Sequence, residues 1–95
     1  MTNPIKLIIA DDEMLIRTGL KIMLEASGNV EVLALAESGR AAFEACKEHQ
    51  PDVVLMDIRM PESNGIEGTK LIKEAFPEVK VLIVTTFQDT EYIVE

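Results

Sequence analysis

Four short apolar runs, separated by longer amphipathic segments, constrain the fold of this chain more than any other feature of its sequence. The runs lie at residues 5–10, 30–36, 53–56 and 79–86, and each has the length and apolar character of a strand. Strands that alternate with helices at this spacing imply right-handed crossovers and a parallel sheet between layers of helices. We therefore predict a doubly wound α/β fold, formed by the 95 residues as one domain.

Two of the predicted strands carry signs of their place in the sheet. Glu31 interrupts the run 30–36 with a charge, which suits an edge strand. The run 79–86 contains four consecutive apolar residues at 81–84, a pattern expected of a strand that is covered on both faces.

The segments between the runs have helical periodicity. We expect a helix over 14–26, ended by Gly28, which readily adopts a positive φ. Ser38 is a candidate N-cap for a second helix that runs to about His49, and a third helix is expected over 65–76. The side chains expected to pack from the first and third helices are Ile16, Leu20, Met23, Leu24, Ile66, Leu71, Ile72 and Ala75.

Carboxylates stand at the ends of two predicted strands. Asp11 and Asp12 follow the run 5–10, and Asp57 follows the run 53–56. Ligands of open parallel sheets bind beyond the carboxyl ends of the strands. If these two strands are neighbours, the three acids converge, and at least one must take up a proton unless a cation offsets their charge. Mg²⁺, which prefers a few carboxylate oxygens, a backbone carbonyl and water, suits such a cluster.

An aspartate beside such a metal can act as a nucleophile and accept a phosphoryl group. Asp57 is our candidate for this role. Thr85 and Thr86, at the end of the run 79–86, are expected to face the same crevice. A hydroxyl there can donate a hydrogen bond to a phosphoryl oxygen, which would report that the phosphoryl group is present.

Three stretches of sequence, IIADDE, VVLMDIRMPESNG and VLIVTT, in this order and spacing resemble the receiver domain of two-component response regulators. The resemblance covers the entire chain, and MPESNGIEGTKLI is similar to the NarL/LuxR-type subfamily. It implies a flavodoxin-like sheet with the strand order 2-1-3-4.

The resemblance also implies a role for each matching residue. Asp57 would be the phosphoacceptor and Thr85 the switch hydroxyl. The Mg²⁺ ligands would be Asp11, Asp12, Asp57 and the backbone carbonyl of Arg59. The residues that border the site would be Thr86, Pro61 and Gly65.

The mechanism that the resemblance implies begins with a histidine kinase, whose phosphohistidine donates to Asp57. Phosphorylation adds about −1.5 to −2 charge with new acceptor oxygens. Thr85 would move toward these oxygens and reshape the face around the fourth helix, a two-state change that controls transcription in the full-length protein. Such a domain assists its own phosphorylation and dephosphorylation but is not a turnover enzyme.

Members of the family continue beyond the point where this sequence ends. They complete the fourth helix, which begins here at about residue 90, and add a fifth strand with a lysine and a fifth helix. We therefore expect residues 1–95 to be a partial receiver domain without its DNA-binding output domain, through which alone it would contact DNA. The strand 79–86 would present an open edge, which favours self-association by edge contact or by exchange of elements. The alternative function is thus a receiver-like interaction or dimerisation fragment with impaired phosphorylation.

Charge and hydropathy exclude several other classes. The net charge is −8 and the basic residues do not cluster, which argues against direct nucleic-acid binding. No apolar run approaches the roughly 18–20 residues of a membrane helix, and no signal peptide is evident, so we expect a cytoplasmic protein. Cys46, the single cysteine, is expected to be a packed thiol.

Two enzyme or binding classes compete with the receiver interpretation. Phosphatases of the haloacid dehalogenase type also use an aspartate at a strand end, but they need a second acid two residues later, where this chain has Arg59. A nucleotide or flavin binder needs a phosphate loop after the first strand, where the sequence DDE repels phosphate in the absence of a metal.

Overall fold

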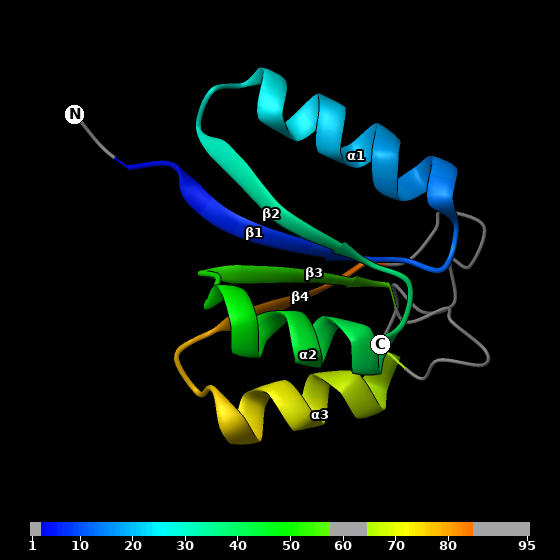
Figure 1. The fold of residues 1–95 in the computed structure, drawn as a ribbon, viewed down its shortest axis with the longest axis vertical. Helices are drawn as coiled ribbons and strands as arrows, with labels where there is room; N and C mark the ends of the chain where they lie inside the picture. The colour runs from blue at the N-terminus through cyan, green and yellow to red at the C-terminus, as the bar shows by residue number, and fades with distance from the viewer. Residues whose placement is uncertain (1–2, 58–64, 85–95) are drawn as a thin grey trace, which may run out of the picture.

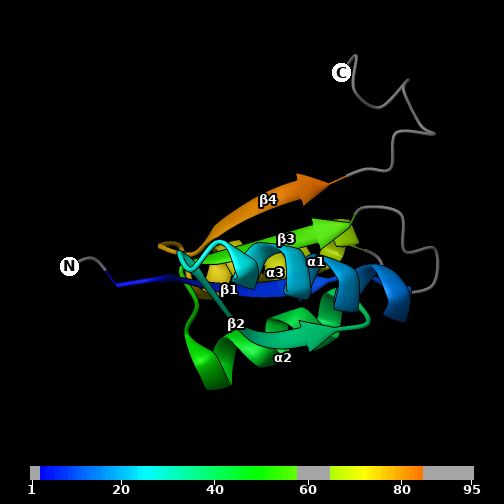
Figure 2. The ribbon, with the colours of Figure 1, turned by 90° about the horizontal axis from the view of Figure 1, so that it is seen from above.

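The computed structural model describes residues 3–57 and 65–84. Over these ranges four parallel strands form one sheet in the order β2-β1-β3-β4, which confirms the predicted fold class and strand order. Helix α1 covers one face of the sheet, and α2 and α3 lie together on the other (Figures 1 and 2). The elements are β1 (Ile5–Ala10), α1 (Met14–Ala26), β2 (Val30–Ala36), α2 (Gly39–His49), β3 (Val53–Asp57), α3 (Gly65–Ala75) and β4 (Lys80–Val84).

The helix ends follow from local sequence. Gly28 has a φ of 83°, a left-handed conformation that lets the chain turn from α1 into β2. The Ser38 hydroxyl oxygen accepts a hydrogen bond from the Ala41 amide at 2.9 Å, which confirms Ser38 as the N-cap of α2. Gln50 ends α2 in the left-handed region with a φ of 51°.

The core has two unequal parts, one on each face of the sheet. The larger part lies between the sheet and helices α2 and α3 and contains Ile8, Ala10, Ala36, Ala42, Cys46, Val54, Met56, Ile72 and Val79. The smaller part lies under α1 and contains Leu7, Ile9 and Val32. The Cys46 thiol is fully buried, and burial raises its pKa to about 11, so the expected packed thiol is confirmed.

The expected packing of α1 and α3 is wrong at three positions. Met23 is 68% exposed, because the face of α1 that meets the sheet follows the four-residue spacing of Ile16, Leu20 and Leu24, which are half-buried. Ile66 and Ala75 of α3 are also exposed, and the fully buried side chain of this helix is that of Ile72.

Strand β4 also differs from expectation. The apolar run predicted a strand covered on both faces, yet Leu82, Ile83 and Val84 are 54%, 48% and 39% exposed. Within the described residues β4 pairs with β3 alone and forms an edge of the sheet, which agrees with the open edge expected of the strand 79–86. In these same ranges we find no helix with the length and apolar character needed to cross a membrane.

Candidate functional site

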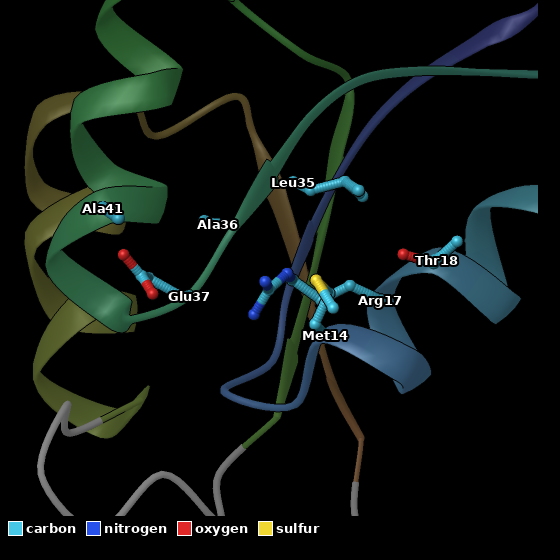
Figure 3. Close-up of a pocket in the computed structure, with 7 residues that line it drawn as sticks. All are labelled: Met14, Arg17, Thr18, Leu35, Ala36, Glu37 and Ala41. Atoms are coloured by element: carbon cyan, nitrogen blue, oxygen red, sulfur yellow. The ribbon is translucent and has the colours of Figure 1, made fainter.

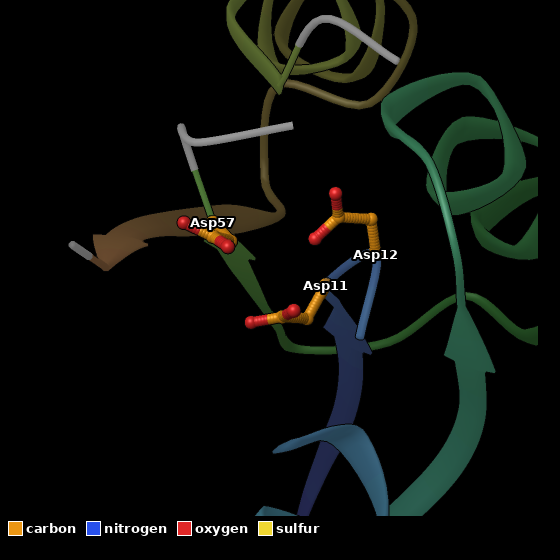
Figure 4. Close-up of side chains that lie close together, drawn as sticks. All are labelled: Asp11, Asp12 and Asp57. Atoms are coloured by element: carbon orange, nitrogen blue, oxygen red, sulfur yellow. The ribbon is translucent and has the colours of Figure 1, made fainter. Parts of the chain in front are cut away.

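The carboxyl ends of β1 and β3 bring the three predicted acids together. The two strands are neighbours, and Ala10 of β1 lies opposite Met56 of β3. Asp11 therefore follows its strand beside Asp57, and Asp12 comes next in the connection to α1 (Figure 4). One carboxylate oxygen from each of the three residues lies within 4.8 Å of the others. The convergence predicted from the strand ends is thus present.

Hydrogen bonds hold Asp11 at three atoms. Its amide donates to the Ala36 carbonyl at 3.0 Å, which joins the end of β1 to the end of β2. Its Oδ1 accepts from the Glu13 amide at 2.9 Å, and its carbonyl oxygen accepts from Nη1 of Arg17 at 2.7 Å. The first bond belongs to the sheet and the other two to the start of α1, so Asp11 is fixed between the two elements.

Burial and mutual repulsion shape the electrostatics of this cluster. Asp11 and Asp57 are 6% and 7% exposed, whereas Asp12 is exposed. Burial, opposed by the hydrogen bond from the Glu13 amide, raises the pKa of Asp11 to about 6, and the charge of Asp57, a hydrogen bond to Asp57 and the charge of Asp12 add to the rise. The free energy of keeping both buried acids ionised is unfavourable unless positive charge is brought to them.

This donor set fits a hard divalent cation. The cluster offers only carboxylate oxygens, two from buried residues and one from the exposed Asp12. Mg²⁺ is bound in proteins by one or two carboxylates together with waters and phosphate oxygens, so an acidic site with one exposed side suits it. The raised pKa of Asp11 provides the physical reason: a cation would offset the cost of burying the charged carboxylate, which is the largest cause of the rise, and also the repulsion from Asp57 and Asp12.

The structure describes only some of the other residues predicted for the site. Gly65 is buried at the first position of α3, and its carbonyl accepts a hydrogen bond from Oγ1 of Thr69 at 2.8 Å. Val84, the last residue of β4, lies opposite Asp57 in the sheet. The positions of Arg59, Pro61, Thr85 and Thr86 lie outside the described residues, so their roles stay predictions.

Sequence reasoning missed Arg17. This residue lies on α1, six positions after the acid whose carbonyl it contacts. An arginine early in a helix has no pattern that distinguishes it from a solvated surface residue. Its contact depends on the path of the chain between β1 and α1, which periodicity does not describe.

A parallel sheet between helices, with an acidic cluster at the carboxyl ends of its strands, is the arrangement expected of a receiver-type signalling domain. The chain belongs to the response regulator receiver domain family, whose model matches residues 7–95. Domains of this family are signalling modules and not enzymes in the usual sense. The recognition made from the sequence motifs is thereby confirmed.

Two curated relatives are similar along almost the whole chain. The transcriptional regulatory protein LnrK of Bacillus subtilis (strain 168) is 54% identical over 91 residues, which are 96% of this chain and 41% of that protein. The oxygen regulatory protein NreC of Staphylococcus haemolyticus (strain JCSC1435) is 43% identical over 89 residues, 93% of this chain and 41% of that protein. The chain thus spans about two fifths of the length of these relatives.

Solved structures agree with this assignment. A DNA-binding response regulator of the LuxR family from Staphylococcus aureus is 34% identical with a TM-score of 0.80, over 95% of this chain and 75% of that one. The response regulator domain of Thermotoga maritima CheB is also 34% identical, with a TM-score of 0.83, over 92% of this chain and 64% of that one. The chain is therefore a receiver domain of the NarL/LuxR type.

Proposed function

We propose that Asp57 is the residue that accepts a phosphoryl group, delivered by the phosphohistidine of a histidine kinase. In this step a carboxylate oxygen of Asp57 forms a bond to phosphorus while the bond from phosphorus to the donor nitrogen breaks, and the kinase histidine leaves neutral by taking up a proton. The observation that carries the proposal is the gathering of three carboxylates within 4.8 Å at the carboxyl edge of β1 and β3.

The placement of Asp57 supports its role as the nucleophile. It ends the central strand β3, is 7% exposed and lies next to Asp11. A nucleophilic carboxylate must be ionised, and its neighbour Asp11 takes up a proton more readily than usual, since its pKa is about 6. A cation held by the cluster would offset the charge of these carboxylates, which would otherwise repel an incoming phosphoryl group.

The residues that we propose to hold Mg²⁺ are Asp11, Asp12, Asp57 and the backbone carbonyl of Arg59. When bound, Mg²⁺ would offset the negative charge that gathers on the phosphoryl oxygens. Asp12 is exposed and so is available to a cation that enters from solvent. We assign the switch hydroxyl to Thr85, next along the chain from Val84, and the border of the site to Thr86, Pro61 and Gly65.

The biological role that we propose is control of transcription by a cytoplasmic two-component system. LnrK is a transcriptional regulatory protein by name, and this chain spans 41% of its length. DNA contact would then come from a C-terminal domain outside these 95 residues. The domain would assist its own phosphorylation and dephosphorylation without acting as a turnover enzyme.

A second candidate function is self-association through β4, with phosphorylation impaired. Three apolar side chains of this strand, Leu82, Ile83 and Val84, are about two fifths to one half exposed. Within the described ranges the backbone of β4 pairs on one side only. An apolar edge strand of this kind favours pairing with a second copy, either edge to edge or by exchange of elements.

Incubation with acetyl phosphate and Mg²⁺, followed by intact mass measurement, tests the first proposal. We expect an adduct of ~80 Da on the wild-type chain and none on Asp57→Asn. Asp52→Asn is a matched control, because Asp52 precedes the same strand at its opposite end and should keep the adduct. A wild-type chain that takes no adduct but sediments as a dimer would favour the second candidate.

A further inference from the structure

We infer that Arg17 is a positioning residue, which fixes the main chain of Asp11 and thereby directs both acids at the end of β1. The inference rests on the proposed Mg²⁺ site and concerns how this site is held in shape. The observation that supports it is a hydrogen bond of 2.7 Å from Nη1 of Arg17 to the carbonyl oxygen of Asp11. A guanidinium donor makes such a bond short and strong.

The planarity of the peptide bond explains why one carbonyl matters for two side chains. The carbonyl of Asp11 and the amide of Asp12 belong to one rigid plane. An arginine that holds this oxygen therefore restricts the orientation of the whole plane, and with it the direction of the Asp12 side chain. Asp11 is already held through its amide and its Oδ1, and the Arg17 contact adds a hydrogen bond at its carbonyl oxygen.

The surroundings of Arg17 indicate that this hydrogen bond holds the side chain in place. Arg17 is half-buried and lines a cavity of about 420 Å³ between α1, the end of β2 and the start of α2. Figure 3 shows its guanidinium beside Met14, with Glu37 farther across the cavity. The described part of the chain contains no ion pair between Arg17 and a carboxylate. The carbonyl of Asp11 is thus the partner that holds the guanidinium.

Arg17 has two opposite effects on a bound cation, and their signs allow them to be separated. Its positive charge repels Mg²⁺, so loss of the charge alone would tighten Mg²⁺ binding slightly, by an amount that salt screens. Loss of the hydrogen bond would instead leave the acids less well directed. Partners that orient metal ligands typically contribute about 10–100-fold to metal affinity. We therefore expect the second effect to prevail.

The test compares Arg17→Met with Lys21→Met by titration of the 95-residue chain with Mg²⁺ at 0.15 M salt. Lys21 lies one turn further along α1 and pairs with Glu25, so its substitution changes the net charge equally without touching Asp11. We expect about a tenfold loss of Mg²⁺ affinity in Arg17→Met, less than twofold change in Lys21→Met, and an intermediate loss in Arg17→Lys. Equal or tighter Mg²⁺ binding in Arg17→Met would overturn the inference.

A second readout does not depend on the metal. The ¹⁵N chemical shift of the Asp12 amide responds to the hydrogen bond on the carbonyl of the same peptide. We expect this shift to change in Arg17→Met and to stay in place in Lys21→Met, with both variants folded by circular dichroism. An unchanged Asp12 shift would refute the role of Arg17. A wild-type chain that binds no Mg²⁺ would instead refute the proposed metal site, and the Asp12 shift would still decide on Arg17.

Discussion

The two faces of the sheet are held by different kinds of interaction. Nine of the described residues are buried in the core beneath α2 and α3, but only three lie in the core beneath α1. Over the described chain α1 has no buried residue, although its 13 residues make it longer than α2 or α3, which have 11 each. The face with α2 and α3 is therefore stabilised chiefly by burial of apolar surface.

The α1 face relies more on polar contacts. The carboxylate of Glu25 accepts a hydrogen bond from the Val32 amide at 2.9 Å and a second from Nζ of Lys21 at 3.0 Å. Val32 lies where the register between β1 and β2 shifts, so α1 attaches to an irregular point of the sheet. The contact from Arg17 to the Asp11 carbonyl is the corresponding attachment at the other end of α1.

The difference matters because two of the three acids of the site belong to the connection into α1. Asp11 and Asp12 lie between β1 and this helix, whereas Asp57 ends β3 in the middle of the sheet. Regions with few buried apolar contacts open at lower free energy than packed ones. Asp57, the proposed acceptor, thus stands on the rigid sheet, while Asp11 and Asp12 depend on polar contacts for their positions.

The strongest test of this contrast is the same substitution in a helix of each face. Ile72 of α3 is fully buried and Ile22 of α1 is 64% exposed. We expect Ile72→Ala to lower the free energy of unfolding by about 3–4 kcal/mol, since it leaves a cavity in the larger core. Ile22→Ala should change it by less than about 0.5 kcal/mol.

Urea denaturation followed by circular dichroism measures both changes, provided that the m-values agree. Similar losses in the two variants would mean that α1 is as tightly packed as α3, and the contrast between the faces would be lost.

A second test concerns the charge at the junction of α1 with the sheet. The pKa of Asp11 is about 6 in the folded protein and has an ordinary value of 3.8, so the folded state binds the proton more tightly. The stabilisation of the folded state by protonated Asp11 is fully present below about pH 4 and is lost as the pH rises through 6. The loss amounts to at most about 3 kcal/mol without a cation.

Chemical denaturation from pH 4 to pH 7.5 checks this dependence. In Asp11→Asn the free energy of unfolding should depend less steeply on pH, and at pH 7 this variant should be more stable than the wild-type chain. Added Mg²⁺ should reduce this difference in stability between the two proteins. Asp52→Asn, at the opposite end of the sheet, should retain the wild-type slope. Parallel curves for the wild-type chain and Asp11→Asn would show that the acid cluster does not strain the fold.

Much of this architecture is predictable from the sequence, for identifiable physical reasons. The apolar runs and Gly28 placed β1, α1 and β2 at their observed bounds, and Ser38 placed the start of α2, because short-range patterns determine such elements. The adjacency of Asp11 and Asp57 needed more, since it depends on strand order, and this order came from the family resemblance. The acid cluster was thus predicted from strand ends and family motifs together.

The errors have a different origin. The exposure of Met23 and of Leu82 depends on what lies against each element, and hydrophobic periodicity does not report that. The contact of Arg17 with Asp11 and the shift in register between β1 and β2 depend on the three-dimensional path of the chain. Contacts between residues of different elements therefore required the structure.

The last test replaces one glycine by alanine in a helix on each face of the sheet. The two substitutions should change the free energy of unfolding in opposite directions. A Cβ added to Gly68 of α3 would lie 2.6 Å from the Cα and the carbonyl oxygen of Gly39, so α2 and α3 meet backbone to backbone at this point. A backbone neighbour cannot rotate away as a side chain can. We expect Gly68→Ala to lower the free energy of unfolding by about 1–3 kcal/mol.

Gly19 of α1 is the matched control, because a Cβ built there has no heavy atom within 4 Å. Alanine restricts the unfolded chain and favours the helix, so Gly19→Ala should raise the free energy of unfolding by about 0.5–1 kcal/mol. Thermal melts of the two variants would then move in opposite directions from the wild-type midpoint. Destabilisation by both substitutions would mean that α1 packs as closely on its neighbours as α3 does on α2, and the acids at the start of α1 would share the rigidity of Asp57.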